Sequence, residues 1–299
     1  MTNRLSKKHH YLPRFYLKGF ANSTNGFFVY DKQLDKFFET SPDSFFFSNN
    51  LNTITYPDGN DSDFLEKIYA DIEKKSATSF KNIRNSSYKI SINHLDKMNL
   101  FFFLLFQHWR LPSNILFVEK IEKNIFKDNS ELDYIKIISE TDKSVPEKFI
   151  NTLRSSKEFN LIVKTAAPFA PFFKDKNWAN KLKNWKFLYT EDNTSWYMVG
   201  DNPIITHGFN DHDPVNCLNE FMFPVSGNVL LVNNCEQVKK ELSPEFVIQF
   251  NVSIIQKAKR FAACQNKCFL EAMVKDYKLH AKYEKTKEII PALFKMVKD

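Results

Sequence analysis

Residues 93–112 read NHLDKMNLFFFLLFQHWRLP and contain the longest apolar run of the chain, seven residues from Leu100 to Phe106. Asn93 is a residue type that caps helix starts, and Pro112 does not allow a helix to continue through the residues before it. The run is long enough to surround the whole helix, which is typical of a helix buried on all sides. It is too short to cross a bilayer. The stretch therefore predicts a central, buried helix.

A second helix is expected just before this one. From residue 61 onward, apolar side chains recur at helical spacing on one face: Leu65, Tyr69, Ile72, Phe80 and Ile83. Asp61 or Ser62 can serve as its N-cap. Beyond Pro112, further helical patterns cover residues 113–126, 131–139 and 146–164. We therefore expect a helical core over residues 61–165.

Strand patterns flank this core on both sides. GFFVYDK, KFFET and LNTIT, all within residues 26–56, predict a small N-terminal antiparallel sheet. WKFLYT and SWYMVG, on either side of an EDN turn, predict a hairpin, and IITHGF, FMFPVS and NVLLV predict further strands. A helix from about Pro244 to Cys264 and an amphipathic helix in the tail EKTKEIIPALFKMVKD should close the chain.

These patterns predict an α+β fold, with a helical core, a small N-terminal antiparallel sheet and a C-terminal antiparallel β layer. A chain of 299 residues can form one large domain, which we expect to span residues 1–299. Within it, the N-terminal motif and small sheet occupy residues 1–60, the helical core 61–165, and the β-rich part with its closing helices 185–299.

The composition narrows the classes of function. Only 6 glycines occur in the chain, which argues against glycine-lined phosphate loops and nucleotide-cofactor folds. A formal charge of +7 and a pI near 9.0 are compatible with a nucleic-acid partner, because lysines and arginines gain from phosphate contacts. The abundance of Lys, Asn, Ile and Phe would equally follow from an AT-rich genome, so the charge leaves both readings open.

Four cysteines, Cys217, Cys235, Cys264 and Cys268, are too few and too irregularly spaced for a disulfide framework. Cys264 and Cys268 would share a helical face, but no second Cys or His pair follows at zinc-finger spacing. The first residues, MTNRLSKKHHYLPRF, contain no apolar segment typical of a secretory signal. We therefore expect a cytoplasmic protein that does not contact a membrane.

The stretch KKHHYLPRFYLKGF, residues 7–20, combines two adjacent histidines with an aromatic anchor. Pro13 favours an extended backbone before it, and burial of Phe15, Leu17 and Phe20 would fix the segment on the core. Neighbouring side chains of an extended segment point to opposite sides, so only one of the histidines at 9 and 10 can face a given pocket. We expect His10 to face the pocket and to act as a metal ligand or acid–base group. The alternative is a hydrophobic staple whose histidines cap local backbone.

Charged side chains also occur at the edges of the predicted helices. Glu66 and Glu73 lie seven residues apart, two helical turns, on the shoulder of the apolar face, where a carboxylate needs a partner or must reach outward to solvent. Arg110 ends the buried helix, where it can cap the last carbonyls or pair with a carboxylate or a phosphate. Asp201-Asn202-Pro203 is either an ordinary tight turn or an acidic group fixed at a rigid loop.

Four separated segments together resemble the DUF4238 family of proteins of unknown function: KKHHYLPRFYLKGFA followed by VYDK, FLEKIYADIEK, QHWRLP and VGDNPI. The resemblance continues through FNVSIIQKAKRFAA, so it covers most of the chain in the expected order. The turn usually reads Ser-Asp-Asn-Pro in that family, whereas Gly200 stands here in place of the serine. The helix end usually reads Arg-Thr-Pro, whereas this chain has Leu111 between the arginine and the proline.

The resemblance implies a set of polar motif positions that coincides with the residues found by spacing and adds Asn251. The expected catalytic residues are His10, Glu66, Glu73, Arg110 and Asp201. The expected supporting residues are His9, Gln107, Asn202 and Asn251. The expected metal ligands, for Mg²⁺ or Mn²⁺, are His10, Glu66 and Asp201.

Convergence of these groups would support phosphodiester hydrolysis, because carboxylates and imidazole move protons or hold a divalent ion, and arginine stabilises charge on the phosphoryl group. We expect a nuclease-like hydrolase that acts on nucleic acid, used as a bacterial defence effector. The alternative is a non-catalytic module that binds nucleic acid or protein and whose polar motif residues form a buried structural network. The two differ in exposure, because a site must reach solvent whereas a network can be sealed.

Overall fold

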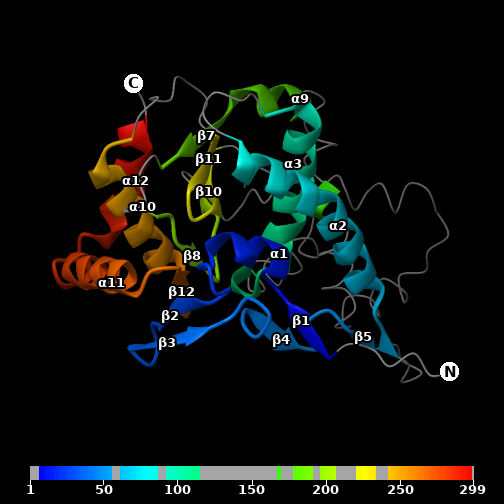
Figure 1. Cartoon of the computed structure of the whole chain (residues 1–299), viewed down its shortest axis with the longest axis horizontal. Helices are drawn as coiled ribbons and strands as arrows, with labels where there is room; N and C mark the ends of the chain where they lie inside the picture. The colour runs from blue at the N-terminus through cyan, green and yellow to red at the C-terminus, as the bar shows by residue number, and fades with distance from the viewer. Residues whose placement is uncertain are drawn as a thin grey trace, which may run out of the picture.

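Two long helices, α2 (Phe64–Asn85) and α3 (His94–Arg110), pack against each other on one side of the molecule (Figure 1). The computed structural model describes residues 7–55, 61–86, 92–114, 167–169, 178–190, 196–206, 220–233 and 242–297. The helices predicted over residues 113–126, 131–139 and 146–164 lie almost wholly outside the described residues, which include only Pro112–Asn114, a single 3₁₀ turn (η2), at the start of this region.

The ends of α3 are those that the sequence predicts. The side chain of Asn93 accepts a hydrogen bond from the backbone N–H of Asp96 at 2.7 Å, and the helix ends at Arg110, two residues before Pro112. Almost every side chain from Leu100 to Arg110 is buried. The expectation of a central buried helix is confirmed.

Helix α2 begins slightly later than the sequence predicts. Its N-cap residue is Asp63, while Asp61 and Ser62 form the short strand β6 (Asp61–Ser62), which pairs with β5 (Ile54–Thr55). The hydroxyl of Ser62 still accepts a hydrogen bond from the N–H of Phe64 at 3.3 Å. The predicted apolar face is the buried one, with Leu65, Tyr69, Phe80 and Ile83 inside.

The N-terminal hairpin of β2 (Phe27–Asp31) and β3 (Lys36–Thr40) belongs to a sheet that also contains C-terminal strands. The strand order is β3-β2-β12-β8, all antiparallel, with β12 spanning Phe261–Cys264 and β8 Val199–Gly200. A separate two-stranded sheet joins β1 (Lys8–His10) to β4 (Phe47–Asn49). The chain thus returns to its own N-terminus, which local sequence patterns did not show.

The C-terminal β layer is a second antiparallel sheet, with the order β7-β11-β10-β9. Its strands are β7 (Trp185–Tyr189), β9 (Ile205–Thr206), β10 (Phe221–Ser226) and β11 (Val229–Asn233). The β10–β11 hairpin is confirmed. The predicted hairpin between β7 and β8 is wrong, because β7 pairs with β11 and β8 pairs with β12 in the other sheet.

Three helices form the C-terminal part: α10 (Pro244–Lys257), α11 (Lys267–Lys282) and α12 (Thr286–Val297). The amphipathic tail helix is confirmed as α12. The predicted helix to Cys264 ends instead at Lys257, and the following residues form β12, the strand between β2 and β8. Cys264 and Cys268 therefore lie in a strand and a helix and do not share a helical face.

Two large clusters of buried apolar side chains fill the interior. One joins α1 (Arg14–Leu17), α3 and β10, and the other joins α10, α11 and α12 to the sheets. Short helical turns complete the described residues: η1 (Lys18–Phe20), η3 (Ala167–Phe169), α9 (Trp178–Lys181) and η4 (Leu182–Asn184). The architecture is α+β, and in the described ranges we find no helix with the length and hydropathy needed to span a bilayer.

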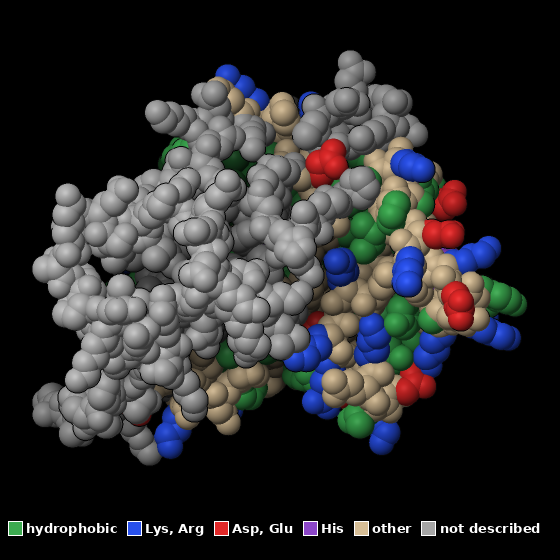
Figure 2. Space-filling view, turned by 180° about the vertical axis from the view of Figure 1, so that it is seen from behind, with side chains coloured by type: hydrophobic (Ala, Val, Ile, Leu, Met, Phe, Trp, Pro, Cys, Tyr) green, Lys and Arg blue, Asp and Glu red, His purple; other side chains and the backbone are tan. Residues whose placement is uncertain are grey.

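Figure 2 shows the opposite face of the molecule from Figure 1. On the side where α11 and α12 lie, Lys and Arg side chains are interspersed with acidic and apolar ones rather than gathered into one patch. The net charge of +7 is therefore not concentrated on that part of the surface.

Candidate functional site

A cleft of about 240 Å³ lies where the N-terminal segment crosses α2 and the end of α3. Its lining residues come from β1, α1, α2 and α3: Lys8, His10, Arg14, Phe15, Glu66, Ala70, Glu73 and Arg110. Segments up to a hundred residues apart in the sequence thus meet here. Four of the five expected catalytic residues line this cleft, and the fifth, Asp201, does not.

The N-terminal segment is held in place by its neighbours in the chain. Strand β1 pairs with β4, and Pro13 is extended, with φ −61° and ψ 143°. Leu17 and Phe20 are fully buried, and Phe15 packs against the same core, as the aromatic anchor predicts. The side-chain amide of Gln107, on α3, donates to the carbonyl of Tyr11 and ties the segment to the central helix.

His9 is the histidine directed into the protein, with 1% of its surface exposed. Its Nδ1 accepts a hydrogen bond from the backbone N–H of Asn52 at 2.9 Å, so this nitrogen carries no proton. The separation of 3.7 Å between Nδ1 and the Oε1 of Glu66 is therefore a polar contact and not an ion pair. Asn52 also donates its side-chain amide to Glu66 Oε1 at 2.6 Å, so Asn52, whose backbone N–H is bound by His9, positions this carboxylate.

His10 projects from the other side of β1 and lines the cleft. It is 8% exposed, and its Nε2 is buried without a hydrogen-bond partner. The hydrogen bond of its ring to the backbone of Asp43 is therefore made through Nδ1, which leaves the Nε2 lone pair available in the neutral form. Burial, followed by the positive charge of Arg14, holds the pKa of His10 below its ordinary value of 6.5.

The expectation that His10 meets the glutamates holds only in part. His10 lines the same cleft as Glu66 and Glu73, but the imidazole next to the Glu66 carboxylate is that of His9. Strand alternation predicted that the two rings face opposite sides. It could not predict that the ring directed into the protein, that of His9, would also lie next to a glutamate, Glu66.

Arg110 faces the carboxylate helix, as predicted, and only 5% of its side chain is exposed. Its guanidinium forms an ion pair with Glu73 and lies over the ring of Tyr69, 4.6 Å from the ring centre. Burial raises the pKa of Tyr69 to about 12, so its hydroxyl stays protonated. Both glutamates reach solvent, with exposed fractions of 24% for Glu66 and 28% for Glu73. The cleft is therefore open and not a sealed network.

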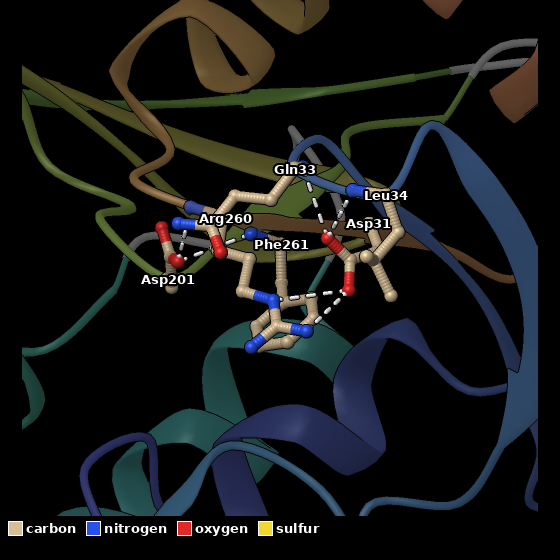
Figure 3. A network of polar contacts seen from close by, with 6 residues as sticks. All are labelled: Asp31, Gln33, Leu34, Asp201, Arg260 and Phe261. Atoms are coloured by element: carbon tan, nitrogen blue, oxygen red, sulfur yellow. Dashed lines mark hydrogen bonds and ion pairs between the residues drawn. The ribbon is translucent and has the colours of Figure 1, made fainter.

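Asp201 has a different task in the structure (Figure 3). Its carboxylate accepts the backbone N–H groups of Lys259 and Arg260 at 2.8 Å each and of Phe261 at 3.0 Å, at the turn between α10 and β12. Burial raises the pKa of this carboxyl, while the three N–H groups act in the opposite direction. The side chain of Arg260 extends from the same turn to the Asp31 carboxylate, with its Nη2 2.8 Å away.

The expected metal ligands are not brought together. His10 and Glu66 line the cleft, but Asp201 is occupied by the turn, and the described part of the chain contains no group of three or more His, Cys, Asp or Glu side chains arranged to hold an ion. The expected set of three ligands is therefore incomplete in the described residues, and binding of Mg²⁺ or Mn²⁺ stays a prediction.

The expected supporting residues are mainly structural ties. Asn251 is fully buried on α10, accepts from the N–H of Met198 at 2.8 Å and donates to the carbonyl of Trp196 at 2.8 Å. Asn202 follows Asp201 in the turn and is partly buried. Gly200, just before this turn, allows close packing, because a Cβ there would lie 3.2 Å from Ile254 Cγ2.

Sequence reasoning missed three residues of the site. Lys8 and Arg14 line the cleft, and Asn52 links His9 to Glu66. The two basic residues stand inside the N-terminal motif, on either side of the histidines, so their proximity was a usable signal. Asn52 lies in an irregular loop, and no sequence pattern indicated it.

Comparison with known proteins gives one result. The family model described as "Protein of unknown function (DUF4238)" matches residues 8–267, which include every cleft residue and the Asp201 turn. No curated protein and no solved structure matches the chain. The match covers most of the chain, and the protein therefore belongs to the DUF4238 family.

Proposed function

We propose that the cleft binds a phosphodiester of nucleic acid and hydrolyses it, with His10 as the acid–base group. One observation carries this proposal: His10, whose buried Nε2 has no hydrogen-bond partner, lines an open cleft that also contains Lys8, Arg14 and Arg110. A buried polar atom without a partner costs stability and calls for an explanation, and a catalytic role would supply one here.

The imidazole suits the role of general base. Because its pKa lies below 6.5, Nε2 is unprotonated at neutral pH and can accept a proton from an attacking water. The water oxygen forms a bond to phosphorus as the bond to the leaving oxygen breaks. The proton held on Nε2 is then returned to the leaving alkoxide, so the products are a phosphomonoester and an alcohol.

The arginines suit the charge of the phosphoryl group. Arg14 is half exposed, and its Nε lies 3.9 Å from the nearest oxygen of Asp43, so it is held loosely and can turn to a ligand. Arg110 is fixed by Glu73 and by the ring of Tyr69, which positions a donor before the substrate binds. Preorganised donors of this kind stabilise charge that develops in the transition state.

Nucleic acid is the substrate class that agrees with the charge of the chain, +7 overall. Cys264 and Cys268 are free thiols, which suits the reducing cytoplasm, and we place the activity there. Cleavage of foreign nucleic acid in a bacterial cell is the use we propose for it.

A non-catalytic binding module is the second candidate, and one observation favours it. Most polar motif residues outside the cleft wall have internal partners, namely His9, Gln107, Asp201 and Asn251. In this case the cleft would hold a phosphate of nucleic acid without cleaving it.

Cleavage of labelled RNA and DNA by the purified protein separates these candidates. We expect wild type to cut at least one of them, His10→Ala to be inactive, and the matched control His280→Ala, on the distant helix α11, to be as active as wild type. Parallel reactions with Mg²⁺, Mn²⁺ and EDTA show whether an ion is required. Binding of the nucleic acid without cleavage would support the binding module, and neither binding nor cleavage would contradict both.

A further inference from the structure

Beside the cleft, α2 presents a row of exposed lysines. A helix turns about 100° per residue, so Glu66, Ala70 and Glu73 share the flank that lines the cleft. The adjoining outward side carries Lys67, Lys74 and Lys81, seven residues apart and all exposed. We call these three lysines the lysine ridge.

Among the described residues, no acidic side chain pairs with Lys74 or Lys81, so the ridge's unpaired charge is at these two lysines. Lys67 is paired with Asp63 at 2.7 Å, just before the helix starts. The nearest acid within α2 on the outward side, Asp71, is directed to the other edge, where it pairs with Lys75 at 2.7 Å.

The side chains between the lysines are small. Ala70 and Ala77 lie one turn before Lys74 and Lys81, respectively, so little bulk separates the ridge from the cleft. Ala70 is itself part of the cleft wall. A polymer that lies along the ridge can therefore enter the cleft without a bulky side chain in its way.

We propose that a single strand of nucleic acid follows the lysine ridge, with its phosphates at Lys74 and Lys81, and enters the cleft past Ala70. This inference rests on the proposed function. The two ammonium groups are separated by two helical turns, about 10 Å along the axis, so they contact different phosphates. The strand is single because His10 is recessed, with 8% of its surface exposed, and a phosphate within a rigid duplex cannot approach its Nε2 closely.

The lysines of α11 and α12 do not offer this arrangement. Those of α11 and α12 lie at the far end of the molecule from α2 (Figure 1), and there the basic side chains alternate with acidic and apolar ones (Figure 2). Lysines of α11 and α12 therefore provide a control, because their removal changes the charge by the same amount at a different position on the surface.

The test compares two double variants that remove two positive charges each. Lys74→Gln with Lys81→Gln alters the ridge, and Lys275→Gln with Lys287→Gln alters exposed lysines of α11 and α12. Gln and Lys have similar helix propensities, so both variants should fold, which their melting temperatures check. Binding is measured by the fluorescence anisotropy of a labelled single-stranded RNA and a DNA of about 12 nucleotides, within the usual range of site sizes, over a series of salt concentrations.

The logarithm of the binding constant falls as the logarithm of the salt concentration rises. Loss of two phosphate contacts should make this negative slope shallower by about 1.4 for the ridge variant. The control variant should keep the wild-type slope. Hydrolysis of a dinucleotide, which occupies only the cleft, should be equal in all three proteins. Equal slopes for ridge and control variants would overturn the ridge while leaving the proposed function intact. Failure of wild type to bind or cleave any of these substrates would overturn the proposed function and the ridge with it.

Discussion

At the residue scale, the two adjacent histidines differ because they lie on opposite sides of one short strand. His9 accepts a backbone N–H and contacts Glu66 inside the protein, whereas His10 keeps a nitrogen without a partner at the cleft. The first ring therefore contributes to the folded structure, and the second is the one available for a ligand. Their roles can be separated by experiment.

Replacement of each histidine by alanine should affect a different property. His9→Ala leaves the N–H of Asn52 buried without its acceptor, and the cost of such an unsatisfied donor is about 1–3 kcal/mol of unfolding free energy. His10→Ala removes an Nε2 without a partner and one hydrogen bond to the backbone of Asp43, so we expect its unfolding free energy to change by less than that of His9→Ala, while the proposed nuclease activity is lost. Urea unfolding and cleavage assays on both variants check this. A stable, inactive His9→Ala protein together with an active His10→Ala protein would reverse the assignment.

The ion pair between Glu73 and Arg110 should be important for stability. Glu73→Gln leaves a guanidinium of 5% exposure without its counter-charge, and breaking a buried pair costs about 3–5 kcal/mol. Because Glu73 itself is 28% exposed, we expect the lower end of that range. Glu66→Gln is the matched control, because a Gln oxygen can still accept from Asn52.

Denaturant unfolding of both variants and of Glu73→Gln with Arg110→Met completes the measurement. The double variant should regain part of the lost stability, because it no longer buries an unpaired charge. Equal stability of Glu73→Gln and Glu66→Gln would show that the pair contributes nothing measurable.

At the element scale, the Asp-Asn-Pro turn joins distant parts of the chain. Asp201 follows β8, and its carboxylate accepts hydrogen bonds from three backbone N–H groups between the end of α10 and the start of β12. Lys32, after β2, donates to the carbonyls of Ile255, Gln256 and Ala258 at the end of α10. Opposite charges thus satisfy both the last carbonyls of the helix and the first N–H groups of the strand.

Asp201→Ala should therefore destabilise the protein strongly. Three N–H groups lose their acceptor in a turn where Asp201 is 7% exposed, and at about 1 kcal/mol for each group the loss is about 3 kcal/mol. Asp71→Ala, at an exposed residue of α2, is the control and should change little. Thermal and urea unfolding measure both. If Asp201→Ala unfolded like wild type but lost all activity, Asp201 would belong to the catalytic machinery after all.

The elements that sequence predicts best are those specified by their own residues. Helices α2 and α3 follow from periodicity, and the cap at Asn93 from its residue type. Strand partners are set by segments far away, so β7 and β8 were joined in a hairpin although each pairs elsewhere. The strand β12 was missed for the same reason, because its short apolar sequence continues a helical pattern and only its pairing with β2 and β8 makes it a strand.

The same distinction applies to the candidate site. Helical spacing placed Glu66 and Glu73 on one flank, and the end of α3 placed Arg110 beside them. Asp201 was grouped with them as an acidic residue at a rigid turn. Whether such a carboxylate faces a cleft or binds backbone depends on the element that packs over it. For Asp201 this element is the end of α10, and the sequence around Asp201 does not reveal that contact.

At the scale of the whole molecule, the fold extends beyond the part that matches the family. The match ends at residue 267, where α11 begins, yet α11 and α12 contribute Leu270, Leu293 and Phe294 to the cluster that includes Phe250 and Ile254 of α10. The two helices therefore belong to the core and cover α10, the helix whose end is held by Asp201.

Stability of the whole molecule should decrease in mild acid because of buried neutral histidines. Burial lowers the pKa of His108 to about 4, and burial with the charge of Arg14 also lowers that of His10. In unfolded chains both rings titrate near 6.5. Between 6.5 and the lowered values the unfolded state binds more protons, so the free energy of unfolding falls as pH falls, and above 6.5 it is constant with respect to these groups.

For His108 the fall from about pH 7.5 to about pH 5 should be on the order of 2 kcal/mol, given a folded pKa of about 4. Urea unfolding at both pH values tests this in wild type and in His108→Gln, which has no titrating group at the position. We expect the difference between the two pH values to be smaller in the variant, whatever its absolute stability, because only the proton linkage has been removed. His280→Gln, at a partly buried histidine of α11, is the matched control, and its pH dependence should equal that of wild type. An equal decrease in wild type and His108→Gln would show that the buried ring is not the source of the acid sensitivity.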